Sequence, residues 1–127
     1  MDIKEKVEGY FIELSIPFDA KEENLWVIDD PDKGMEKVIV AANDQVVTIT
    51  VNVMEVPSSK KEEFFETLLK LNATDMIHGA YGINGDNVVL TDSLEGPTMD
   101  LPELQASLDA ISLAISQHYS VLKKYRA

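Results

Sequence analysis

The side chains of this sequence that could do chemistry are two histidines and a scattered set of carboxylates. His78 and His118 fall in different predicted elements, and neither has a histidine or carboxylate at the helical spacing that metal sites use. Asp75 is near His78 in the sequence but in a loop or strand, which leaves open whether the two could form a catalytic dyad. No serine stands in a Gly-x-Ser-x-Gly turn. The absence of cysteine excludes thiolate nucleophiles, disulfides and sulfur-based metal sites.

Two further motifs could bind ions or phosphates, but both lack essential parts. Asp29, Asp30 and Asp32 form an acidic turn, yet an EF-hand loop counted from Asp30 needs a glutamate where the sequence has Ala41. The glycines at 79–85 precede no helix and no Gly-Lys-Ser/Thr sequence, so a hairpin explains them better than a phosphate loop. The sequence therefore predicts no catalytic residue, no metal site and no cofactor.

The charge balance narrows the classes of partner. The 127 residues include 11 basic and 23 acidic side chains, a net charge of −12. Binding to phosphates or to anionic lipid needs clustered basic residues, so a field this negative opposes nucleic-acid and membrane-surface roles. The N-terminal residues lack a basic start followed by an apolar run, and no apolar stretch is long enough to span a membrane. We expect a cytoplasmic protein.

Hydrophobic periodicity predicts the elements that would position any site. Helical spacing marks residues 2–14, 60–74 and the segment from Leu101 onwards, and strand patterns mark residues 25–28, 36–42, 46–54, 77–83 and 87–91. We expect a capping box of Ser59 and Glu62 at the second helix, and a type I′ hairpin at Asn84-Gly85. The predicted order is α-β-β-β-α-β-β-α, an α+β fold in which helices pack an antiparallel sheet, with residues 1–127 as a single domain.

Two apolar surfaces exceed what one docking face requires. The helix at 60–74 carries apolar residues over an arc wider than a surface helix usually needs, which favours a dimer interface made by Phe64, Phe65, Leu68 and Leu69. The strict alternation of 46–54 predicts a sheet with one buried and one open face. The open face could hold an extended client peptide at Trp26, Ile28, Val46 and Met54. Cover by loops or helices of the same chain is the alternative for both surfaces.

The order of elements and several local strings resemble one known family. The chain is similar to the type III secretion chaperone-like proteins (the Tir chaperone, or CesT, superfamily), and within it to the stand-alone YbjN-type proteins. The resemblance runs from about Leu25 to the C-terminus. Its motifs are Leu68-Leu69-Lys70-Leu71-Asn72, Gly79-Ala80-Tyr81-Gly82-Ile83, Val88-Val89-Leu90 and the leucines 94, 101, 104 and 108.

The resemblance implies a function of the binding class. It implies a small acidic homodimer, non-enzymatic and chaperone-like, whose grooves hold a segment of a client protein. It supplies no catalytic residues. The alternative is a YbjN-type regulatory protein that binds a folded signalling or stress-response partner. Neither the client nor any link to a secretion system follows from the sequence.

Overall fold

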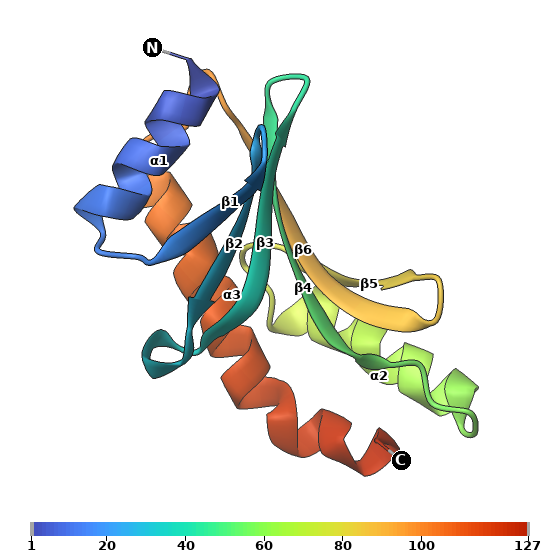
Figure 1. The fold of residues 1–127 in the computed structure, drawn as a ribbon. Coiled ribbons are helices and arrows are strands. Elements are labelled where there is room, and N and C mark those ends of the chain that lie inside the picture. Colours follow the sequence, from blue (N-terminus) through green and yellow to red (C-terminus); the bar gives the residue numbers. More distant parts are fainter. Residues whose placement is uncertain (1, 127) are drawn as a thin grey trace.

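The computed structural model describes residues 2–126. Three α-helices and six strands follow one another, with two short 3-10 helices between and after them (Figure 1). In chain order they are α1 (Ile3–Glu13), β1 (Phe18–Glu22), β2 (Leu25–Asp30), η1 (Pro31–Lys33), β3 (Met35–Asn43), β4 (Val46–Glu55), α2 (Lys61–Thr74), β5 (Ala80–Asn84), β6 (Asn87–Glu95), α3 (Leu101–Leu122) and η2 (Lys123–Tyr125).

All six strands form one antiparallel sheet with the order β1-β2-β3-β4-β6-β5. Successive strands along the chain pair with each other except where α2 intervenes between β4 and β5. There β6 lies beside β4 and leaves β5 at the edge. The predicted α+β fold with an antiparallel sheet is confirmed.

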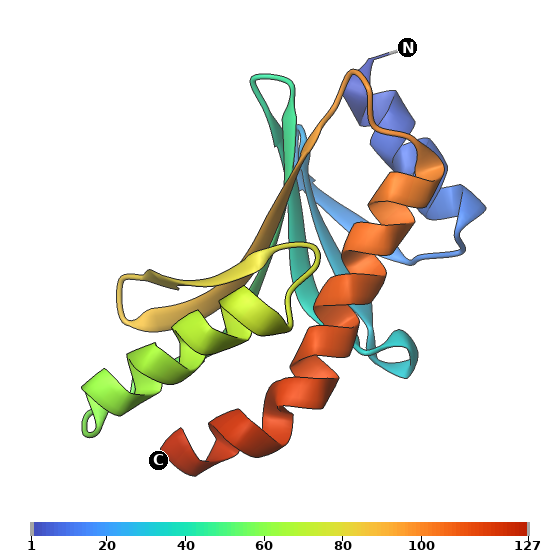
Figure 2. The same cartoon turned by 180° about the vertical axis from the view of Figure 1, so that it is seen from behind.

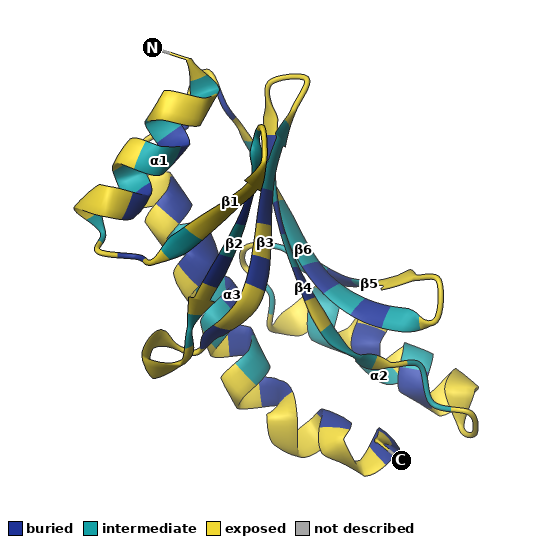
Figure 3. Ribbon diagram, viewed as in Figure 1, coloured by how far each residue is buried: buried dark blue, intermediate teal, exposed yellow. Residues whose placement is uncertain are grey.

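The three helices pack against one face of this sheet. Figure 2 shows α2 and α3 in front of the strands, whereas the opposite side, seen in Figure 1, has no helix across it. One hydrophobic core joins residues of all three helices to residues of the sheet, including Phe11 of α1, Phe64 of α2 and Leu108 of α3. Burial of large side chains on a single sheet face explains the alternation along the strands, visible as alternating colours in Figure 3.

Local details differ from the sequence-based predictions at several places. β1 was not predicted, because four of its five residues are exposed and it lacks the alternating apolar pattern of a half-buried strand. α2 begins without a capping box, since its N-cap is Lys60, at a φ of 58° and without a side-chain cap bond. The capping box occurs instead at α3, where Asp100 and Glu103 bond to each other's backbone amides.

The predicted hairpin turn is shifted by one residue. Asn84 pairs with Asn87, so the two-residue loop is Gly85-Asp86, and of these only Gly85 has a positive φ. A type I′ turn requires positive φ at both loop positions. That pattern is found instead between β3 and β4, where Asp44 and Gln45 have φ values of 49° and 71°.

Among residues 2–126, no helix combines the length and apolar character needed to cross a membrane.

Candidate protein-binding surfaces

The strand register decides which of the predicted client-binding residues face outward. Trp26 pairs with Val40, and Val40 pairs with Ile49, so all three lie in one row on the helix-covered face. Trp26 and Ile28 are completely buried in the core. The indole Nε1 of Trp26 donates a hydrogen bond of 2.7 Å to Glu8 of α1. The prediction that these two residues contact a client is therefore wrong for the subunit as it stands, because its own helices cover them.

Met54 also lies on the helix side, because β4 contains a bulge. Asn52 pairs with Val89 and Met54 pairs with Val88, which leaves Val53 as an extra residue in the ladder. An extra residue reverses the alternation beyond it. Met54 consequently shares the face of the buried Val88 and packs, half-buried, against the core. Of the four predicted client residues, Val46 alone remains outward, and it is 38% exposed.

The uncovered face has a different set of residues from the one predicted. One row crosses five strands through Val27, Ile39, Thr50, Thr91 and Ala80. Its centre is a mixture of aliphatic and hydroxyl side chains, and the hydroxyls of Thr50 and Thr91 are 3.3 Å apart. Ile39 is 43% exposed, whereas its chain neighbours Val38 and Val40, on the helix-covered face, are almost completely buried. This surface, which we call the open face, can accept apolar side chains and hydrogen bonds together.

The predicted dimer residues divide between core and surface. Phe64 and Leu68 are buried, and the ring of Phe64 packs edge-on against Tyr125 at 4.9 Å between centroids. Phe65 is half-buried and Leu69 is 67% exposed. These two lie four positions apart and so share one side of α2. The arc of α2 is therefore wide because one part fills the core and the other part faces outward.

Phe65 lies next to the β5–β6 hairpin at the surface. Phe65 and Ile83 line the same shallow hollow, together with Val56 and Pro57 of the loop before α2. Ile83 is 47% exposed. We call Phe65, Leu69 and Ile83 the outer patch. The arrangement offers apolar area next to an exposed sheet edge, which is the kind of surface that a second chain can cover.

The side chain of Asn72 hydrogen-bonds α2 to the edge strand β5. Asn72 accepts a hydrogen bond from the backbone amide of Tyr81 at 2.7 Å and donates one to the Tyr81 carbonyl at 3.1 Å. Its amide therefore takes the place of a neighbouring strand at this position. The outer patch consequently lies on two elements whose relative position is fixed.

A polar cluster joins α2, β5 and α3 behind this patch. The Tyr81 hydroxyl lies 2.7 Å from Nδ1 of the buried His118, and Nε2 of His118 lies 3.2 Å from the Asp75 carboxylate. Burial, and secondarily the charge of Asp75, raises the pKa of Tyr81 to about 12. The hydroxyl therefore keeps its proton and can donate it to Nδ1, while Nε2–H donates to Asp75.

The cluster revises the interpretation of the histidines. Asp75 bonds to His118, and His78 is exposed elsewhere. A tyrosine that acted as a base or nucleophile would need a lowered pKa, whereas the pKa of Tyr81 is raised. The arrangement fits a buried connection between three elements. Within residues 2–126, no group of three or more metal-ligating side chains comes together.

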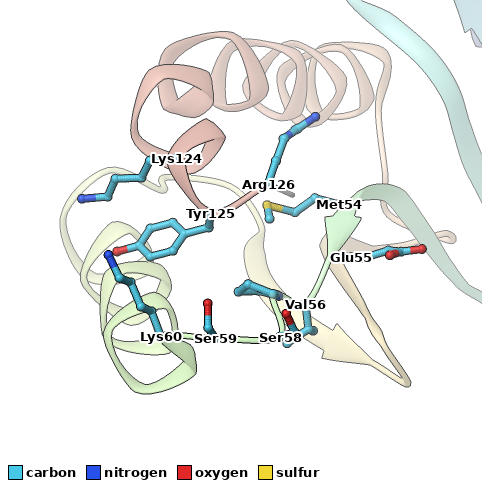
Figure 4. Close-up of a pocket in the computed structure, with 10 residues that line it drawn as sticks. Met54, Glu55, Val56, Ser58, Ser59, Lys60, Lys124, Tyr125 and Arg126 are labelled. Atoms are coloured by element: carbon cyan, nitrogen blue, oxygen red, sulfur yellow. The ribbon is translucent and has the colours of Figure 1, made fainter.

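A cleft lies at the N-terminal end of α2, next to η2 (Figure 4). Its volume is about 600 Å³, and one wall is the segment from Met54 to Lys60. The other wall is made by Lys124 and Tyr125 of η2 and by Arg126, which follows η2. Sequence reasoning missed this cleft because its two walls are far apart in the chain and only the packing of η2 on α2 brings them together.

Comparison with known proteins shows which family this chain matches. A family model, CesT_Tir_1, matches residues 1–127. The chain belongs to the CesT_Tir_1 family. The predicted resemblance to the type III secretion chaperone-like superfamily is thereby confirmed. Among curated proteins, a search finds no significant match to this CesT_Tir_1 protein.

Solved structures similar to this CesT_Tir_1 protein share its fold at low sequence identity. The ExoU-SpcU complex from the type III secretion system of Pseudomonas aeruginosa matches at a TM-score of 0.71 and 11% identity, over 87% of this chain and 93% of that one. The Yersinia pestis secretion chaperone SycH, bound to a YscM2 fragment, matches at 0.67 and 12%, over 91% and 98%. YbjN from E. coli, a candidate transcription regulator, matches at 0.64 and 16%, over 90% and 89%.

Proposed function

We propose that this protein is a chaperone-like binding module that works in the cytoplasm and holds a segment of a client protein without catalysing a reaction. The observation that carries the proposal is the open face, where Ile39 and Val46 stay exposed although three helices cover the other face. Family membership supports it. So does the presence of bound protein partners in the SpcU and SycH structures, which share this fold.

The open face suits an extended segment better than a globular partner. Ile39 and Ala41 of β3 lie beside Thr50 and Thr48 of β4, so apolar side chains of a segment could meet aliphatic residues and its polar groups could meet hydroxyls. Val46 is retained from the predicted client residues, and Ile39 and Val27 replace Trp26, Ile28 and Met54.

We also propose that the protein is a homodimer joined through the outer patch. Phe65 and Leu69 would meet the second subunit, while Phe64 and Leu68 support them from the core. A twofold interface places the same patch of each subunit face to face. Ile83 enlarges the apolar area beyond α2 alone.

Replacing Leu69 with aspartate tests the dimer. A charge buried at an interface is costly, so we expect Leu69→Asp to give a folded monomer where the wild-type protein is a dimer, measured by light scattering at micromolar concentration. Leu113→Asp is the matched control, because Leu113 is also an exposed leucine on a helix but lies on α3. A wild-type monomer, or a dimer that persists in Leu69→Asp, would contradict the proposed interface.

Similarity to YbjN favours a second candidate function, a regulatory protein that binds one folded partner. The two candidates differ in the state of the bound partner. Limited proteolysis of a purified complex would leave a short protected segment for a chaperone-like module and an intact folded domain for a regulator.

A further inference from the structure

Basic side chains are concentrated at one end of this acidic molecule. Of its eleven Lys and Arg residues, five lie in two short segments, at 60–61 and 123–126. The packing of η2 near the start of α2 brings these segments to the same place, at the cleft of Figure 4. Lys60, Lys124 and Arg126 line that cleft. The rest of the chain carries six basic residues against a total of 23 acidic ones, so this local excess is unusual.

Glu62 and Glu63, in the first turn of α2, lie near the cations of the cleft but, within residues 2–126, do not form salt bridges with them. In the described part of the chain, none of the three cations forms a salt bridge, whereas Lys21, Lys33 and Lys70 each pair with an acidic side chain. One carboxylate, Glu55, belongs to the lining, and in Figure 4 it points away from Lys60 and Lys124. The N-terminal end of the α2 dipole adds to the positive potential.

The floor of the cleft is apolar and its wall is fixed. Met54, Val56 and Pro57 line it opposite the ring of Tyr125. The Tyr125 hydroxyl donates a 2.8 Å hydrogen bond to Glu63 of α2, which anchors η2. The Lys124 ammonium lies 5.2 Å from the centre of the same ring. The cleft thus combines fixed apolar contacts with cations at its rim.

We propose that this cleft binds an acidic segment of the client protein, with an apolar residue on the floor and carboxylates at Lys60 and Lys124. Charge complementarity supports an acidic occupant, because the rest of the surface would repel it. The volume of about 600 Å³ can take a few residues. The inference rests on the proposed function, and it adds a second contact point, separate from the open face.

A pair of peptides and two charge-reversal variants test the inference. The probe is a labelled peptide of alternating glutamate and leucine, and its matched control has glutamine for every glutamate. We expect the wild-type protein to bind the acidic peptide and not the control in a fluorescence anisotropy titration. Lys60→Glu combined with Lys124→Glu should weaken this binding by about tenfold or more, because two ion pairs become repulsions.

The second variant distinguishes an effect of the cleft on binding from an effect of the net charge of the molecule. Lys4→Glu combined with Lys21→Glu changes the net charge by the same amount at exposed positions away from the cleft, and we expect it to bind the acidic peptide nearly as well as the wild type. Equal weakening in both variants, or no binding by the wild-type protein, would overturn the inference. Client capture through the open face does not depend on this result, so failure of the cleft leaves the proposed function standing.

Discussion

At the scale of single residues, the cluster of Tyr81, His118 and Asp75 illustrates how a possible catalytic group can be structural. Its members come from three elements, and each hydrogen-bonding atom of the imidazole has a partner. The raised pKa of Tyr81 keeps the hydroxyl protonated at physiological pH. The cluster connects β5 to α3 and α2 behind the outer patch. Its expected contribution is to stability.

The pKa of Tyr81 predicts a loss of stability at alkaline pH. Its value rises from 10.0 to about 12 on folding, so the native state binds more protons than the unfolded state between these values. The contribution is complete below pH 10 and is lost as the pH rises to about 12, with a total of roughly 2–3 kcal/mol. We expect Tyr81→Phe to lack this loss in urea unfolding measured at a series of pH values. Identical pH profiles for the two proteins in this range would refute the assignment.

The residue scale also shows where sequence reasoning failed. The sequence analysis left Asp75 as a possible partner of His78 and did not indicate which side of the last helix His118 faces. The structure buries His118 and exposes Tyr119. Its partner Asp75 lies on a different element, and that long-range contact has no signal in the sequence.

At the scale of elements, β4 explains both a success and an error of prediction. The alternation from Val46 to Val51 correctly gave one buried and one open face. The bulge at Val53 then moved Met54 to the helix side. A bulge depends on how β4 pairs with β6, so the alternation of one strand does not reveal it. Trp26 and Ile28 were predicted on the wrong face because the sequence of β2 alone does not show which of its faces the helices cover; strand pairing shows it.

The attachment of α2 to β5 gives a prediction at this scale. Asn72→Ala removes both hydrogen bonds to the Tyr81 backbone, and we expect it to lower the free energy of unfolding by about 1–3 kcal/mol. Asn52→Ala is the control, since Asn52 is exposed on β4. Urea denaturation measures both. If the two variants lose the same stability, Asn72 does not hold the edge of the sheet.

At the scale of the whole molecule, the distribution of the helices explains why apolar surface remains for a partner. Three helices cover one face of a six-stranded sheet and build one core, and none covers the other face. The fold class followed from the order of helical and alternating patterns. The surfaces did not, because exposure depends on which side of the sheet each helix takes. We expect the open face to serve a different contact from the outer patch and the basic cleft, which border each other at Val56 and Pro57.

The most direct test of the central claim is capture of a client from native cells by the protein and two aspartate variants. The open face predicts that wild-type protein retains a specific client and that Ile39→Asp loses most of it, by about tenfold, because aspartate places a charge in an apolar contact. Ile12→Asp, at an exposed isoleucine of α1, should retain the client. If Ile39→Asp remains folded and captures as much client as the wild-type protein, the open face is not the binding surface and the account is wrong.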